Sequence, residues 1–269
     1  MLRATWATLG SKGGTGKSTL NTAIVQGLAL CALQAGDENS LAVQGLTDED
    51  AEKNIQDWML FDQVDIRASN PAARSEWKQL RDDPRAITFV IDGGANRLAE
   101  DLAIAKAANL ILMPVTNSAK PLREIANDIK VMVENGVDAS KIWITPNAWP
   151  ADVREGRAGY LKRARAEARL LYYLGEYPRL MRPVQEHGFV DFIDDNDAIV
   201  PAQLTKKAWQ AEKHLRDVLI SFNRFSLELA NDVEAIAAGT YQPWQPRHHP
   251  ELSSFDPEAP DTEQEGADA

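Results

Sequence analysis

A glycine-rich segment near the N-terminus constrains this chain more than any other part of it. Its sequence is Ser11-Lys12-Gly13-Gly14-Thr15-Gly16-Lys17-Ser18-Thr19. Glycine backbones can turn their N–H groups inward around phosphate oxygens, while the ammonium group of Lys17 would reach the β- and γ-phosphates of a nucleotide. An apolar run at residues 5–9 precedes the segment, and apolar residues at helical spacing follow it. The order of strand, glycine loop and helix predicts a nucleotide-binding P-loop at a helix N-terminus, which attracts anions.

A second lysine distinguishes this segment from an ordinary P-loop. The sequence from Lys12 to Ser18 resembles the deviant Walker A loop of the ParA/MinD family of ATPases, although Ser11 occupies the position of the first Walker A glycine. The resemblance implies that Lys12 is a signature lysine, which reaches phosphates bound by a partner subunit and takes part in catalysis with Lys17. It also implies that residues 11–19 bind ATP and that Ser18 binds Mg²⁺. The alternative is a flexible glycine-rich turn with incidental lysines.

Length and composition set broad limits on the protein. With 269 residues and 44% hydrophobic content, the chain suits one large α/β domain or two small ones. No stretch reaches the roughly 18 apolar residues that cross a bilayer, and the N-terminus runs directly into an expected strand and not into a signal peptide. The single cysteine, Cys31, excludes disulfides, zinc clusters and an iron–sulfur cluster shared between subunits. We therefore expect a cytoplasmic protein with no membrane partner.

A second part of the expected nucleotide site lies at residues 87–94. Their sequence is Ile87-Thr88-Phe89-Val90-Ile91-Asp92-Gly93-Gly94. A nearly continuous apolar run that ends in a carboxylate is typical of a buried parallel strand. Ligands bind at the carboxyl ends of strands in open α/β sheets, so we expect Asp92 to be the Walker B residue and to hold Mg²⁺ directly or through water.

The chain alternates expected strands with expected helices. Apolar runs predict strands at residues 5–9, 40–43, 87–91, 110–114 and 141–145. The long connections predict an α/β fold with a mostly parallel sheet and helices on both faces, the three-layer sandwich of P-loop NTPases. We place a P-loop ATPase domain at residues 1–240. The acidic, proline-rich residues 241–269 are expected to be disordered, because they bury too little apolar surface to offset chain entropy.

The resemblance fails after the second expected strand. Family members carry an Asp-x-Asp-Pro-Gln segment there, whose first aspartate helps to position the attacking water. This chain has Gln44, Gly45, Leu46, Thr47 and Asp48 at those positions. We expect Thr47 to cap a helix whose first turn is acidic, with a relocated catalytic site as the alternative. Intrinsic ATP hydrolysis is therefore expected to be weak.

Asn147 follows the strand expected at residues 141–145. The family commonly places an asparagine at this strand end to contact the adenine edge, so the resemblance implies that Asn147 binds the nucleotide. An asparagine after Pro146 is also an ordinary turn residue. The sequence leaves both interpretations open.

The net charge of −11 hides a basic region. Residues 154–182 contain eight basic and three acidic residues, whereas residues 243–269 contain one arginine and seven carboxylates. One helix in the basic region carries Lys162, Arg163, Arg165 and Arg169. Because no side chains suited to base readout lie between them, this face would bind DNA phosphates irrespective of sequence. A solvated helix face that binds nothing is the alternative.

The leading hypothesis is an ATPase switch that resembles ParA. ATP and Mg²⁺ would close a homodimer through Lys12, and the dimer would bind DNA nonspecifically and position a plasmid, a chromosome region or a transfer complex. A ParB-like protein or cargo adaptor would trigger hydrolysis, and DNA binding would make the protein nucleoid-associated. One alternative is a nucleotide-gated scaffold with little turnover, which the missing aspartates favour. The other is a metabolic P-loop kinase or synthetase, against which Lys12 counts.

Overall fold

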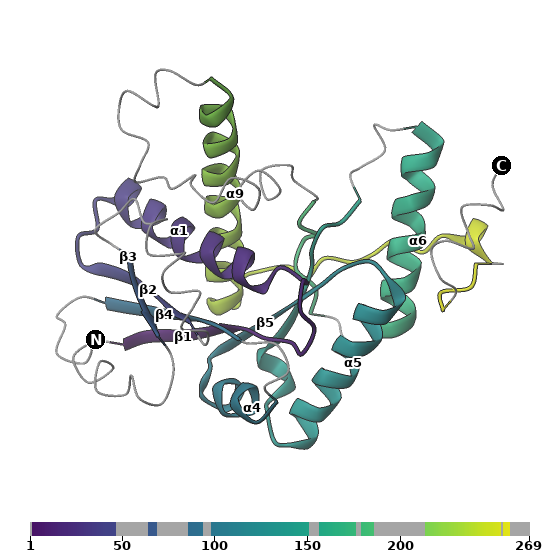
Figure 1. Cartoon of the computed structure of the whole chain (residues 1–269), viewed down its shortest axis with the longest axis horizontal. Helices are drawn as coiled ribbons and strands as arrows, with labels where there is room; N and C mark the ends of the chain where they lie inside the picture. Colours follow the sequence, from purple (N-terminus) through teal and green to yellow (C-terminus); the bar gives the residue numbers. More distant parts are fainter. Residues whose placement is uncertain are drawn as a thin grey trace.

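The computed structural model describes residues 2–46, 64–68, 86–93, 98–150, 156–175, 179–185, 213–253 and 255–258 (Figure 1). The strands are β1 (Leu2–Thr8), β2 (Ser40–Leu46), β3 (Val64–Ala68), β4 (Ala86–Asp92), β5 (Leu110–Val115) and β6 (Ile142–Pro146). The α-helices are α1 (Lys17–Ala35), α4 (Leu98–Ala107), α5 (Ala119–Glu134), α6 (Gly156–Leu174) and α9 (Lys213–Ala237). Two short 3₁₀ helices are η3 (Ala139–Lys141) and η5 (Pro250–Leu252).

Within the described residues, six strands form one sheet in the order β3-β2-β4-β1-β5-β6. Every adjacent pair of strands is parallel. All residues of β5 and β6 are buried, because helices cover both faces of the sheet. Burial on both faces requires apolar side chains on both sides of a strand, which explains the continuous apolar runs in the sequence. The predicted α/β fold with a mostly parallel sheet is confirmed.

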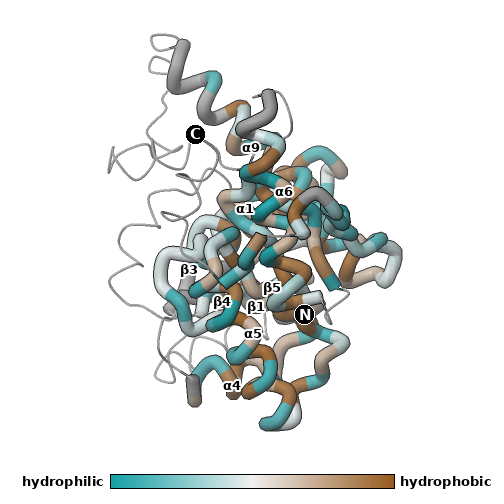
Figure 2. The backbone as a smooth tube through the Cα atoms, turned by 90° about the vertical axis from the view of Figure 1, so that its right-hand side faces the viewer, coloured by the Kyte–Doolittle hydropathy of each residue, from teal (hydrophilic) through white to brown (hydrophobic). Residues whose placement is uncertain are grey.

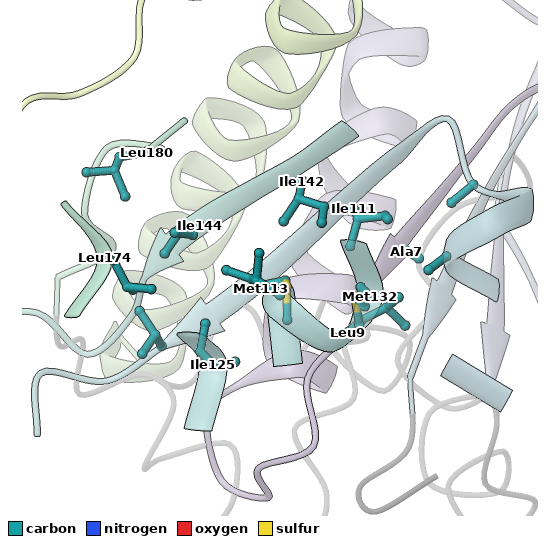
Figure 3. Close-up of a cluster of buried hydrophobic side chains, with 14 of the residues drawn as sticks. Ala7, Leu9, Ile111, Met113, Ile125, Met132, Ile142, Ile144, Leu174 and Leu180 are labelled. Atoms are coloured by element: carbon teal, nitrogen blue, oxygen red, sulfur yellow. The ribbon is translucent and has the colours of Figure 1, made fainter. Parts of the chain in front are cut away.

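Two hydrophobic cores lie on opposite faces of the sheet. Helices α1 and α9 pack on one face, and α4, α5 and α6 pack on the other (Figure 1). In the second core, Figure 3 shows Ile125 of α5 and Leu174 of α6 beside Met113 and Ile144 of the sheet. Hydrophobic and hydrophilic residues alternate along α5, as expected of a helix with one buried face (Figure 2).

A glycine follows the end of each of two helices. Gly36 caps α1 with a φ of 64°, and Gly136 follows α5 with a φ of 86°. These angles lie in the left-handed region, which glycine adopts without the steric penalty of a side chain. Ser118 is the N-cap residue of α5, although its side chain makes no capping hydrogen bond. Local sequence therefore sets both helix ends.

Strand β2 is longer than the sequence predicts. It continues through Gln44 and Gly45 to Leu46, and Leu46 pairs with Asp92 of β4, whereas Gln44 pairs with Val90. Each strand residue advances about 3.3 Å, so Gln44 lies about 6.6 Å short of the level of Asp92. The expectation that Gln44 follows the strand is wrong. Leu46 is the β2 residue at the level of Asp92.

The C-terminal segment also differs from its prediction. Residues 241–253 and 255–258 have defined contacts, although the sequence predicts disorder from residue 241. The ring of Tyr241 lies edge-on to that of Trp143 at 5.6 Å, and the ring of Trp244 lies edge-on to that of Trp149 at 6.4 Å. The average composition of this acidic segment conceals the few aromatic residues that anchor it.

Some predictions fall on residues outside the described ranges. These are the helix cap at Thr47 with Asp48, and the last residues of the predicted tail, 259–269. Among the helices that the structure describes, none combines the length and the apolar character needed to cross a bilayer.

Candidate nucleotide-binding site

The glycine-rich loop joins β1 to α1 at the carboxyl end of the sheet. Gly14 and Gly16 have φ angles of 74° and 88°, a region that disfavours side chains. Gly16 is the N-cap residue of α1, and neither a side-chain cap nor an acidic residue in the first turn occupies this helix end. The N–H groups and the macrodipole of an uncapped helix N-terminus favour an anion. The loop therefore has the backbone geometry of a phosphate cradle.

Lys17 begins α1 and has an exposed fraction of only 7%. Its Nζ donates a hydrogen bond to the carbonyl oxygen of Lys12 at 2.7 Å. Burial lowers the pKa of Lys17, and the carboxylates of Asp92, Asp101 and Asp128 oppose this effect. The phosphates of a nucleotide would supply further negative charge next to this buried ammonium group.

Ser11 is held by α5. Oδ2 of Asp128 accepts hydrogen bonds from the backbone N–H and from the hydroxyl of Ser11, each at 2.8 Å. A glycine at position 11 would keep the first bond and lose the second. The structure thus gives a reason for the serine that occupies the position of the first Walker A glycine.

Lys12 lies beside the same helix. Its Nζ is 3.9 Å from Oε2 of Glu124, and about a third of each side chain is exposed (35% and 33%). Exposed ion pairs of this kind contribute about 0–1 kcal/mol, so this contact holds Lys12 only weakly. Lys12 can therefore leave Glu124 at low cost.

Asp92 ends β4 at the level of Thr8, the last residue of β1. Oγ1 of Thr8 lies within hydrogen-bond distance of Asp92 Oδ1, at 3.5 Å, and Asp92 is 7% exposed. Ser18 is exposed at the second position of α1. A hydroxyl and a carboxylate are oxygen donors of the kind that Mg²⁺ takes, with phosphates and water as its remaining ligands. The described residues contain no cluster of three or more His, Cys, Asp or Glu that would hold a metal without such help.

Asn147 contacts the loop from the end of β6. Its Nδ2 donates a hydrogen bond to the carbonyl oxygen of Thr15 at 2.9 Å. A Cβ on Gly16 would overlap the amide of Asn147, so only glycine allows this approach. The structure thus brings Asn147 to the loop, and contact with adenine stays a prediction.

Sequence reasoning missed three carboxylates around the loop. Asp128 and Glu124 lie on α5, Asp101 lies on α4, and Asp101 and Asp128 are only 3% and 7% exposed. Oδ1 of Asp101 would be 3.3 Å from a Cβ built on Gly93, directly after Asp92. One sequence signal could have revealed them: a carboxylate on the helix face that the spacing of apolar residues predicts to be buried.

The four basic residues of α6 that the sequence predicts to bind DNA differ in exposure and do not form one exposed face. Lys162 is exposed, and Arg165 is partly buried. Arg163 donates from Nε to Oε1 of the buried Glu167 at 2.9 Å, and its side chain is 19% exposed. Arg169 is 4% exposed, with its guanidinium carbon 5.4 Å from the centre of the Phe255 ring.

The C-terminal segment accounts for this burial. Oε2 of Glu167 accepts a hydrogen bond from the backbone N–H of Arg247 at 2.8 Å and lies 3.0 Å from Nε2 of His249. On its other side, Nδ1 of His249 is 3.3 Å from the hydroxyl of Tyr160. These contacts hold residues 247–249 on α6, with Phe255 further along the same segment.

Solved structures that align with this chain include ParA and MinD proteins. The MinC:MinD cell division complex of Aquifex aeolicus aligns with a TM-score of 0.56 and 10% identity, covering 86% of this chain and 96% of that one. The cell division ATPase MinD of Pyrococcus furiosus has a TM-score of 0.52 and 16% identity, covering 87% and 99%. The pnob8 ParA has a TM-score of 0.52 and 13% identity, covering 89% and 99%.

The sequence itself matches no protein-family model and no curated protein. At these identities the structural alignments establish the fold. They extend over most of this chain and nearly the whole of each neighbour, so the likeness is not confined to the loop. The chain therefore has the fold of the ParA/MinD-like P-loop ATPases.

Proposed function

We propose that this protein is an ATP-dependent dimerising switch of the ParA type. The observation that supports this most strongly is the buried ammonium group of Lys17, which is hydrogen-bonded to a neutral carbonyl at an uncapped helix N-terminus. In this proposal Lys17 and the N–H groups of residues 11–19 bind the phosphates. Ser18 and Asp92 hold Mg²⁺, which neutralises phosphate charge when bound.

Lys12 is the residue through which nucleotide controls dimerisation. Its weak contact with Glu124 leaves it able to reach phosphates bound by a second copy of the chain. In this proposal Asn147 holds the loop through Thr15 and also borders the base. The position of both residues at one loop supports these roles.

Turnover is weak in this proposal. Leu46 lies at the level of Asp92 and cannot orient or deprotonate water. Lys12, Lys17 and Mg²⁺ still stabilise charge on the transferred phosphoryl group, so slow hydrolysis remains feasible. The same observation favours the second candidate, a nucleotide-gated scaffold whose signal is ATP occupancy.

In this proposal the dimer binds DNA nonspecifically and positions a cargo, and a ParB-like protein or another cargo adaptor is its partner. Lys162 is the exposed member of the predicted basic set, and Arg165 adds a partly buried cation on the same helix. Arg163 and Arg169 are engaged within the fold, so the contact with DNA phosphates is narrower than the sequence predicts.

One experiment separates the two candidates. ATP turnover is measured with and without DNA, and Mg²⁺-ATP binding is measured on the same preparation. Tight ATP binding with slow turnover that DNA accelerates supports the switch. Tight binding with no turnover under any of these conditions supports the scaffold, and no ATP binding contradicts both.

A further inference from the structure

A cavity lies away from the P-loop. Its volume is about 780 Å³, within the range of small-molecule sites. Ala4 of β1 and Leu110 of β5 line it from the first half of their strands, while the P-loop follows the carboxyl end of β1. The last turns of α9 and the residues that follow them, including Tyr241, form the opposite wall. The cavity therefore lies between the sheet and the end of α9.

Two cations line this cavity. Nζ of Lys141 donates to the carbonyl oxygen of Ala108 at 3.1 Å, and Nη1 of Arg179 donates to that of Ser140 at 2.6 Å. Within the described part of the chain, neither cation forms a close ion pair with a carboxylate, but both contribute, after the hydrogen bonds from Ser140, to the lowered pKa of the exposed Asp138 carboxyl. Glu234 of α9 lines the cavity as well, so the described lining residues carry two positive charges and one negative charge.

Three aromatic side chains, those of Trp6, Trp143 and Tyr241, line the cavity. Trp143 has Tyr241 edge-on to its ring, and the guanidinium carbon of Arg179 lies 6.0 Å from its ring centre. Trp6 is 3% exposed, and its indole Nε1 has no hydrogen-bond partner.

We propose that this cavity binds a small organic anion with a flat, apolar ring system. Lys141 and Arg179 would bind its anionic group, and Trp6, Trp143 and Tyr241 would pack against its ring. A ring accounts for the aromatic side chains that lie beside the two cations, since an inorganic anion would leave those side chains without contact. This site does not depend on nucleotide binding.

Fluorescence titration with anilinonaphthalene sulfonate tests this proposal, because that probe is an aromatic anion whose emission rises in apolar surroundings. N-phenylnaphthylamine, which lacks the sulfonate, is the matched neutral probe. We expect the parent to bind the sulfonate at one site per chain. Lys141→Gln and Arg179→Gln should each weaken it about tenfold, the effect of losing one charged hydrogen bond. Binding of the neutral probe should change less than twofold.

Lys130→Gln is the control for charge loss, since Lys130 is exposed on α5 and pairs with Glu134. It should bind the sulfonate like the parent. Arg179→Lys should retain most of the sulfonate affinity, because it keeps the positive charge. Lys17→Ala should also leave the titration unchanged. Equal sulfonate affinity in the parent and in both cavity variants would overturn the proposal. Loss of binding in Lys17→Ala would place the probe at the P-loop and would overturn it as well.

Discussion

The glycine-rich loop and helix α6 both concentrate cations in a short stretch, but the fold uses these cations differently. In the loop, Lys17 is hydrogen-bonded to a neutral carbonyl at an uncapped helix end. In α6, Arg163 pairs with the buried Glu167, and Arg169 lies over Phe255. A cation with a neutral partner stays available to an anionic ligand, whereas a cation paired with a buried carboxylate contributes to the fold. The partners of a basic side chain thus indicate its role better than the local charge does.

The largest effect is expected at the loop. Lys17→Ala should weaken ATP binding by at least about a hundredfold, because backbone N–H groups alone do not neutralise the phosphates. Titration calorimetry with Mg²⁺-ATP measures this loss. Lys130→Ala removes an exposed lysine on α5 and should bind ATP like the parent. Equal ATP affinity in Lys17→Ala and the parent would remove the basis of the P-loop assignment.

The next largest effect concerns the stability of α6. Glu167→Ala should lower the free energy of unfolding by about 3 kcal/mol, because Arg163 and the N–H of Arg247 lose a buried acceptor. Chemical denaturation measures the change. Glu134→Ala breaks an exposed ion pair with Lys130 and should cost less than about 1 kcal/mol. Similar costs for the two variants would mean that Glu167 does not hold the C-terminal segment.

A smaller effect is expected on turnover. Leu46→Asp should raise the single-turnover rate of ATP hydrolysis about tenfold, because it introduces a carboxylate at the level of Asp92. Gln44→Asp, about two residues further from that level, should raise it less. Rapid-quench measurements at saturating ATP compare the two. A larger gain from Gln44→Asp would mean that residue 44 occupies the position of the water-positioning aspartate, as the family resemblance implies.

The smallest effect concerns DNA. Lys162→Glu should reduce the slope of log affinity against log salt by about 0.9, which corresponds to one lost phosphate contact. Arg169→Gln should leave the slope unchanged, because Arg169 is buried against Phe255. Binding to DNA of unrelated sequences at several salt concentrations gives both slopes. If Arg169→Gln flattens the slope as much as Lys162→Glu, the segment that holds Phe255 must leave α6 when DNA binds.

Much of the fold was predictable because its signals are local. Helical spacing places Leu122, Ile125 and Ile129 on the buried face of α5, and all three are fully buried. Gly36 ends α1 through its own backbone preference. The end of β2 was not predictable in this way, because pairing with β4 sets it and the apolar run stops at Val43.

The candidate site was predictable only in part. The loop and Asp92 lie within short motifs, and the structure places them at the same end of β1 and β4. The contact between Ser11 and Asp128 joins residues 117 positions apart, so no local pattern reveals it. The burial of Arg169 likewise depends on Phe255, which lies in a segment whose composition predicts disorder.

Sedimentation velocity in Mg²⁺-ATP and in Mg²⁺-ADP tests the central claim, that nucleotide at the P-loop controls dimerisation through Lys12. The parent should be dimeric with ATP and monomeric with ADP. Lys12→Ala should still bind ATP and stay monomeric, while Lys120→Ala, an exposed lysine that also lies near Glu124, should dimerise like the parent. An ATP-dependent dimer of Lys12→Ala, or a parent whose oligomeric state is the same with both nucleotides, would contradict this account.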